Sequence, residues 1–424
     1  MSLPLSLWAG TARLAAPLLR RMLRRRLARG KEIAGRLDER EGRDATPRPA
    51  GRLIWLHAAS LGETMSILPL LPHLTAEAGH VLLTTGTVTS QRLLAARLPA
   101  LGLEARVLTR FVPLDVPAWV ARFLDHWRPD AAGFVESEIW PNLLSTAAQR
   151  GIPLMLVNAR LSARSLARWR RAPRTARAVL GFFSLIHPQS ASDAARFAQL
   201  TTTRILPPGN LKLAAPPLPA TGADLSHLTS IIGGPAWVAA SLHPGEDALI
   251  LGVHARLSAT HPGLLTIIVP RHPERGETLA AAAGGAPRRS QGAPPPERGG
   301  IWIADTVGEL GLIYRLAPLA FIGGSLVRHG GQNPAEAARL GRAVAVGPHT
   351  GNFADTVALL AASGGLVVVE DAQALGNWLD ARLKDPWGTT AMGQRGAGVL
   401  AGYESLPGEV ASMLLALADA GQEG

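Results

Sequence analysis

The sequence predicts an α/β protein built from two doubly wound, Rossmann-like domains. Short and almost continuously apolar runs alternate with stretches of helical character, which is typical of parallel strands covered by helices on both faces. Several of these runs lead into loops rich in Gly, Ser or Thr. A Pro-rich segment, Pro207–Ala220, separates the runs into two series. A chain of 424 residues is long enough for two domains, each with its own core.

The predicted strands follow in chain order. In the first series they are Leu53–His57, His80–Thr84, Ala132–Val135, Leu154–Val157 and Phe183–Ile186. In the second they are Trp237–Ser241, Leu265–Val269, Ile301–Ile303, Leu319–Ile322, Ala343–Val346 and Leu366–Val369. We therefore expect an N-terminal segment at 1–30, a first domain at 31–213 and a second at 214–424. Ligands of doubly wound sheets bind at the carboxyl ends of the strands, so we expect the two domains to face a central cleft there.

Composition excludes several classes of protein. The chain has no cysteine, which rules out disulfides and thiolate metal sites. Neither a metal spacing of histidines nor an Asp-x-Asp pair occurs, so we expect no metal and no cofactor. The net charge of +11 lies in one half, because residues 1–213 carry 30 Lys and Arg against 14 Asp and Glu. Nucleic acid is not the expected partner, since aromatic residues make up only 5% and no nucleic-acid-binding module is recognisable.

The N-terminal segment is apolar from Leu3 to Leu19 apart from Arg13 and a few polar residues, and a run of arginines follows. A secretory signal has the opposite order of charge and apolar stretch. The apolar stretch is also shorter than the roughly 20 residues of a transmembrane helix. We expect an interfacial or barely spanning membrane anchor with its arginines on the cytoplasmic side. The alternative is an amphipathic helix docked on its own domain.

One strand, helix, strand unit predicts a phosphate and ribose pocket. The run Leu319–Ile322 leads into glycines 323, 324, 330 and 331, and then into Asn333-Pro334, an N-cap followed by Pro at the first helical position. The free N–H groups of a helix N-terminus suit a phosphate, and Glu336, one turn later, can accept hydrogen bonds from a ribose. The alternative is an ordinary tight turn.

Three loops of the first half lie at predicted strand ends. The turn Ala58–Glu63 places a carboxylate, Glu63, at the start of a helix, and Thr85–Ser90 is rich in hydroxyls. Glu136, Ser137 and Glu138 follow a third strand. Each alone is compatible with simple helix capping. Three on the same edge of one sheet favour a site.

Seven motifs, in one order, closely resemble the 3-deoxy-D-manno-octulosonic acid (Kdo) transferases of lipopolysaccharide assembly. They are His57–Glu63, Glu136–Asn142, Asn158–Ser162, Gly209–Lys212, Val269–Pro273, Asp305–Leu310 and Gly330–Glu336. The resemblance implies a GT-B fold, CMP-Kdo as donor, a tetra-acylated lipid A precursor (lipid IVA) as acceptor, inversion at the anomeric carbon and no metal. It also implies a location at the cytoplasmic face of the bacterial inner membrane. A related enzyme that uses a UDP-sugar is the alternative.

The residues and the resemblance together assign roles. Glu63 is the expected general base, and Glu136 and Lys212 stabilise the transition state or the donor. The expected nucleotide-binding residues are Arg271, His272, Val307, Gly308, Glu309, Asn333, Pro334, Ala335 and Glu336. The expected acceptor-binding residues are Ser60, Gly62, Thr85, Gly86, Thr87, Arg160 and Arg164. If the strand continues to Glu138, that side chain should point to the opposite face from Glu136, because alternate residues of a strand face opposite sides.

Seven arginines between Arg160 and Arg177 form a further candidate surface. A solvated basic helix is the usual meaning of such a run. Because this half of the chain is expected to meet a phosphorylated lipid, we expect contacts with phosphates or lipid headgroups. The loop 284–300, rich in Pro, Gly and Arg, is expected to be a mobile surface insertion. No role is assigned to the segment Ser241–Glu246.

Overall fold

The computed structural model describes residues 3–421, and contacts divide the chain into two compact units. Unit 1 comprises Met1–Ala215 and Ser405–Gly424, and unit 2 comprises Pro216–Glu404. The last helix, α18 (Leu406–Ala420), therefore belongs to unit 1 and not to the second domain predicted at 214–424. Its apolar stripe explains the difference, because Val410, Leu414 and Leu415 are buried in the core of unit 1.

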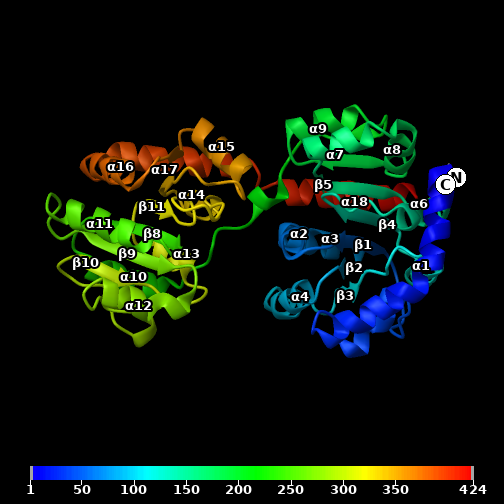
Figure 1. The fold of residues 1–424 in the computed structure, drawn as a ribbon, viewed down its shortest axis with the longest axis horizontal. Helices are drawn as coiled ribbons and strands as arrows, with labels where there is room; N and C mark the ends of the chain where they lie inside the picture. Colours follow the sequence, from blue (N-terminus) through cyan, green and yellow to red (C-terminus); the bar gives the residue numbers. More distant parts are fainter. Residues whose placement is uncertain (1–2, 422–424) are drawn as a thin grey trace. The chain divides into compact units, whose positions relative to one another are not determined.

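Unit 1 contains a seven-stranded, all-parallel sheet in the order β3-β2-β1-β4-β5-β6-β7 (Figure 1). Its strands are β1 (Leu53–Ala58), β2 (His80–Thr85), β3 (Val107–Phe111), β4 (Ala131–Val135), β5 (Leu154–Ala159), β6 (Leu185–Pro188) and β7 (Arg204–Ile205). All five predicted strands are present. The prediction missed β3, whose middle residues are only partly buried, and β7, which has two residues.

The helices of unit 1 cover both faces of this sheet. They are α1 (Leu3–Ala28), α2 (Leu61–Ile67), α3 (Leu71–Ala78), α4 (Val88–Ala100), α5 (Pro117–Trp127), α6 (Pro141–Gln149), α7 (Ala163–Trp169), α8 (Pro173–Leu180) and α9 (Ala191–Ala198). Alternate residues of β1 enter different cores: Trp55 packs with residues of α5 and α6, and Leu56 packs with residues of α3 and α18. Both faces are buried, which is why the strands read as continuous apolar runs.

Local sequence signals account for many helix starts. Ser60, Thr87, Ser162 and Ser190 are N-caps whose hydroxyls accept a hydrogen bond from the backbone N–H three residues later. Helices α5, α6 and α8 begin with Pro, which has no N–H to leave unpaired in the first turn.

Unit 2 contains a six-stranded parallel sheet in the order β10-β9-β8-β11-β12-β13. Its strands are β8 (Ala236–Leu242), β9 (Leu265–Pro270), β10 (Gly300–Ile303), β11 (Leu319–Ile322), β12 (Ala343–Val346) and β13 (Leu366–Val368), all of them predicted. Its helices are α10 (Gly222–Ile231), α11 (Asp247–Ser258), α12 (Gly276–Ala282), α13 (Leu310–Arg315), α14 (Ala335–Arg339), α15 (Ala354–Ala362), α16 (Ala372–Lys384) and α17 (Pro386–Ala401). Figure 1 shows α11 and α16 on one side of this sheet and α10 and α12 on the other.

The N-terminal helix α1 contacts its own unit along one face. Leu5 is buried in the core, the Trp8 indole N–H donates to Asp115 at 2.7 Å, and Arg20 forms an ion pair with Glu41 at 2.9 Å. Another part of its surface is apolar and exposed, with Leu14 at 82% and Leu18 at 71%. Among residues 3–421, no helix is both long and apolar enough to cross a membrane.

Candidate functional site

The start of α2 holds Glu63 in a capping box at the carboxyl end of β1. The Glu63 carboxylate accepts hydrogen bonds from the Ser60 hydroxyl and the Ala59 N–H, both at 2.8 Å. The Ser60 hydroxyl in turn accepts from the Glu63 N–H at 3.3 Å. The arrangement satisfies the Glu63 N–H of the first helical turn and the Ala59 N–H just before the N-cap. It also fixes the carboxylate at the sheet edge, where the turn at Gly62 was expected to place it. Gly62 itself is exposed.

Three carboxylates lie close enough to influence one another at this edge. Burial raises the pKa of Glu63, the hydrogen bonds from Ser60 and Ala59 oppose the rise, and the negative charges of Glu138 and Glu136 add to it. A carboxylate with a raised pKa is a stronger base than an ordinary surface glutamate. The arrangement can therefore accept a proton from a hydroxyl group.

Glu136 and Lys212 form an ion pair at 2.6 Å, so the structure brings together two residues predicted to support the reaction. Glu136 has φ of 58°, in the left-handed region that few non-glycine residues adopt. Hydrogen bonds from Glu136 N–H to Val157 O and from Arg160 N–H to Glu136 O hold it there. Lys212 lies on the turn Leu211–Ala214, which is tied to β5 because Leu211 N–H donates to Asn158 Oδ1 at 3.0 Å.

The prediction of opposite faces for Glu136 and Glu138 assumed that the strand continues to Glu138. The strand β4 ends at Val135, so the alternation of strand side chains does not apply. Glu138 accepts from the Trp140 indole N–H at 2.6 Å and lies 3.3 Å from His57 Nε2. Burial alone would raise the pKa of Glu138, but hydrogen bonds with His57 and Trp140 outweigh it and lower the pKa. No role was predicted for His57 or Trp140, although both lie inside motifs quoted above.

Two predicted acceptor residues have structural partners instead. Thr85 is fully buried, and its hydroxyl accepts from the Gln91 side chain at 2.8 Å, so the prediction that it binds the acceptor is wrong. Thr87 is the N-cap of α4 and bonds Ser90. Gly86 passes so close to Ala59 that a side chain there would meet its carbonyl oxygen. The hydroxyl-rich loop is thus explained by packing and capping.

In unit 2, the residues predicted to hold phosphate and ribose converge. Asn333 accepts from Ala335 N–H at 3.1 Å and donates to Glu336 at 3.2 Å, so it caps the turn that starts α14. Pro334, and not Asn333, is the residue that immediately precedes this helix, which is only five residues long. Burial raises the pKa of Glu336, while Asn333 and the positive charge of Arg271 oppose the rise. Arg271 therefore lies near Glu336, at the carboxyl end of β9, and neighbouring His272 is exposed.

The other predicted nucleotide motif lies before α13. Glu309 pairs with Arg289 at 2.8 Å and accepts from the Thr306 hydroxyl, and these contacts lower its pKa. Val307 is 85% exposed, and Gly308 has φ of 86°. Arg289 belongs to the loop 284–300. That loop is attached to the unit at neighbouring positions as well, because Arg288 and Ser290 both bond Asp305 at 2.8 Å.

Glu246 has a structural role that was not predicted. It is fully buried, and its carboxylate accepts four backbone N–H bonds, from His243 and Gly324 on one oxygen and from Ser325 and Leu326 on the other. It thereby joins the end of β8 to the glycine loop after β11. Gly323 is required there, since a side chain would meet Ser241 O at 2.7 Å. The signal available in the sequence was the acidic pair Glu246-Asp247 after an apolar strand.

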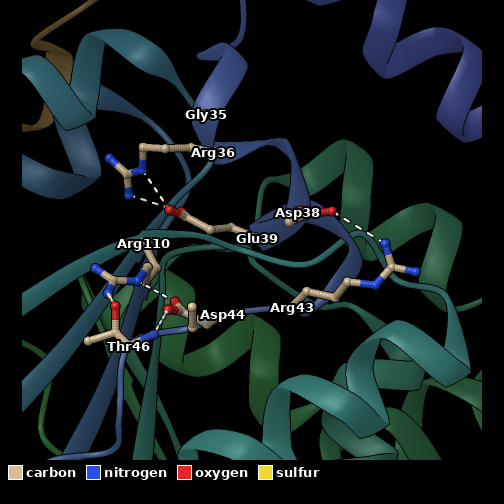
Figure 2. Close-up of a pocket in the computed structure, with 9 residues that line it drawn as sticks. Gly35, Arg36, Asp38, Glu39, Arg43, Asp44, Thr46 and Arg110 are labelled. Atoms are coloured by element: carbon tan, nitrogen blue, oxygen red, sulfur yellow. Dashed lines mark hydrogen bonds and ion pairs between the residues drawn. The ribbon is translucent and has the colours of Figure 1, made fainter.

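Two surface features complete the description of the site. The arginines 160, 164, 168, 170, 171, 174 and 177 are all exposed, and residues 139–192 contain no acidic side chain. A pocket of about 460 Å³ lies beside β3, but Figure 2 shows that its charges are paired, as in the ion pairs of Arg36 with Glu39 and of Arg110 with Asp44. We assign no ligand to this pocket. Within residues 3–421, no group of three or more acidic, His or Cys side chains is placed to hold a metal ion.

Comparison with known proteins then identifies the family. The family model for 3-deoxy-D-manno-octulosonic-acid transferase (kdotransferase) matches residues 32–215. A probable mitochondrial 3-deoxy-D-manno-octulosonic acid transferase of Arabidopsis thaliana is 37% identical over 376 residues, which are 84% of this chain and 82% of the relative. The chain belongs to the Kdo transferase family. The Kdo transferase of Haemophilus influenzae is also similar, at 34% identity over 85% of both chains.

A solved structure supports the fold assignment for this Kdo transferase family member. UDP-GlcNAc 2-epimerase from Neisseria meningitidis, bound to UDP-GlcNAc, covers 86% of this chain and 99% of its own, with a TM-score of 0.58. At 12% identity the likeness shows the fold alone. The predicted GT-B class of two Rossmann-like domains is confirmed.

Proposed function

We propose that this Kdo transferase transfers Kdo from CMP-Kdo to a hydroxyl of a tetra-acylated lipid A precursor, lipid IVA, with inversion and without a metal ion. The observation that supports this most is Glu63, a fixed carboxylate with a raised pKa among two further carboxylates. A sugar hydroxyl is a weak nucleophile and needs a base as it attacks. Membership of the Kdo transferase family indicates that the transferred sugar is Kdo.

The proposed reaction is a single displacement. The acceptor oxygen forms a bond to the anomeric carbon of Kdo, its proton passes to Glu63, and the bond from that carbon to the phosphate of CMP breaks. One displacement inverts the anomeric carbon. The leaving phosphate gains negative charge, which Lys212 is suited to stabilise because its side chain is 42% exposed and carries a cation beside Glu136. Glu136 holds that cation in place.

For the donor, we propose that unit 2 binds the nucleotide. Arg271 and His272 follow β9 and offer cations or hydrogen bonds to the phosphate and the base, while the turn Asn333–Glu336 contributes N–H groups and a buried carboxylate. The Glu309 carboxylate already forms an ion pair with Arg289. We therefore propose that the nucleotide contacts Gly308, the backbone beside it and the exposed Val307.

For the acceptor, we propose that unit 1 provides the membrane-facing surface at the cytoplasmic side of the inner membrane. The exposed leucines of α1 suit the boundary of a lipid layer. Arg160, Arg164 and the arginines that follow suit anionic headgroups and the phosphates of the acceptor. Ser60 and Gly62 lie beside the base at the same edge.

The direct test is the mass of the product. Incubation of the protein with CMP-Kdo and lipid IVA, with EDTA present, should add one or more Kdo masses. Glu63→Gln keeps the shape and removes the base, so the rate should fall by about 10² to 10⁴. CMP should still raise the melting temperature of that variant, and UDP should not. Absence of product with the unmodified protein, or near-normal turnover in Glu63→Gln, would contradict the proposal.

Membrane association has its own test. Deletion of residues 1–29 removes exposed apolar surface and six arginines after Leu19, each worth about 1 kcal/mol near an anionic surface. The full chain should bind anionic liposomes at low salt and detach partly as salt screens the charge. The shortened chain should bind less. Equal recovery of both chains in the liposome-free fraction at low salt would refute the anchor.

A further inference from the structure

Three side chains of unit 1, His57, Glu138 and Trp140, form a hydrogen-bonded chain that the proposed reaction leaves unused. Both contacts fall on one carboxylate oxygen: the Trp140 indole N–H donates to Glu138 Oε2 at 2.6 Å, and His57 Nε2 lies 3.3 Å from the same oxygen. The other oxygen, Oε1, has no hydrogen-bond or ion-pair partner within residues 3–421. The Glu138 side chain is 17% exposed. One oxygen is therefore held while the other is open to a ligand.

The contacts around His57 hold both sides of its ring. Its Nδ1 lies 3.0 Å from the hydroxyl oxygen and 3.2 Å from the carbonyl oxygen of Thr84, and its Nε2 faces Glu138. The His57 side chain is only 1% exposed, so the buried ring is fixed in place and, through Nε2, it fixes the direction of Glu138.

Trp140 contributes the second half of the arrangement. It directly precedes α6 and is 42% exposed, although its only polar atom in the ring system is already bonded to Glu138. An indole anchored through its N–H presents a rigid apolar surface at little cost in side-chain freedom. A flat apolar surface next to an open carboxylate oxygen matches a pyranose ring, which has an apolar C–H face and hydroxyls at its edge. Ligand sites typically combine a mainly apolar wall with a small number of polar groups.

We propose that Glu138 and Trp140 form a subsite for the sugar ring of the acceptor, with a hydroxyl donating to Glu138 Oε1 and the ring packed on Trp140. His57 is a positioning residue that acts through Glu138. This rests on the proposed function. We assign the acceptor sugar and not the donor because Glu138 lies near Glu63, and the proposed reaction requires an acceptor hydroxyl beside that base. A hydroxyl can donate to a carboxylate.

The test separates acceptor binding from donor binding and from chemistry. Initial rates are measured for the unmodified protein, Glu138→Gln, Trp140→Phe and Trp140→Leu, with lipid IVA varied at saturating CMP-Kdo and then the reverse. Glu138→Gln and Trp140→Leu should raise KM for lipid IVA about tenfold or more, the size expected for loss of a hydrogen bond to a charged group. KM for CMP-Kdo should change less than about twofold. Trp140→Phe retains a flat ring, so its KM for lipid IVA should lie between that of the unmodified protein and that of Trp140→Leu.

Controls make each outcome decisive. Trp387→Leu changes a tryptophan that is 88% exposed in unit 2 and should leave both KM values unchanged. Melting temperatures show whether each variant folds, and Trp140→Phe keeps the test available if Trp140→Leu does not. If the unmodified protein forms product and both Glu138→Gln and Trp140→Phe keep the KM for lipid IVA of the unmodified protein, the subsite is refuted while the proposed function stands. If the KM for CMP-Kdo rises instead, the residues serve the donor and the inference is wrong.

Discussion

Replacement of Glu246 by Gln should destabilise unit 2 strongly. The carboxylate accepts two backbone N–H bonds on each oxygen, at 2.7 and 3.0 Å on one and at 3.0 and 3.1 Å on the other. An amide keeps one oxygen, but its NH₂ group must face two N–H donors, so two bonds are lost. Each hydrogen bond to a charged group contributes about 1.5–3 kcal/mol, which gives a loss of roughly 3–6 kcal/mol.

For a domain of this size, 1 kcal/mol corresponds to about 2–4 °C in melting temperature, so Glu246→Gln should melt at least about 6 °C lower. The assay is thermal unfolding followed by circular dichroism. Glu297→Gln is the matched control, because Glu297 is exposed and has no side-chain hydrogen bond or ion pair within the described part of the chain. A Glu246→Gln protein that melts within 2 °C of this control would refute the reasoning.

Two further predictions concern the site. Catalysis needs Glu63 ionised, and its pKa is raised, so kcat/KM should fall as the pH decreases through a value above that of an ordinary glutamate. Glu138→Gln removes a neighbouring negative charge and should move this acid limb to lower pH; a shift to higher pH in the pH-rate profile would contradict the assignment. Asn333→Ala and Glu336→Ala should each weaken CMP binding about tenfold in calorimetry, because they remove the cap of the turn and the proposed ribose acceptor. Unchanged CMP affinity in both variants would mean that the turn Asn333–Glu336 does not bind the nucleotide.

The fold could be predicted from the sequence because its signals are local. Strands buried on both faces, such as Leu53–Ala58, appear as unbroken apolar runs, and the turn after each is marked by Gly, Ser or Pro. Edge strand β3 was missed since half-buried residues interrupt its apolar pattern. The return of α18 to unit 1 was missed for a different reason: an amphipathic helix shows which face is buried but not what covers it.

The site was predictable to the extent that its members follow strands. The pairing of Lys212 with Glu136 joins two loops far apart in sequence, and nothing local to either residue indicates it. Thr85 was misassigned because the sequence does not show whether a hydroxyl at a strand end faces solvent or a neighbouring side chain. In the structure it faces Gln91. The position of Glu138 depended on where β4 ends, and strand ends are the least certain feature of a sequence-based assignment.

The return of the last helix makes unit 2 an insertion within unit 1. During synthesis, all of Pro216–Glu404 leaves the ribosome before Ser405, so the inserted unit can complete its core first. The sheet of unit 1 meanwhile has one face partly uncovered until Leu414 and its neighbours arrive. Loss of the last twenty residues would therefore harm the first half of the chain more than the half to which they are adjacent in sequence.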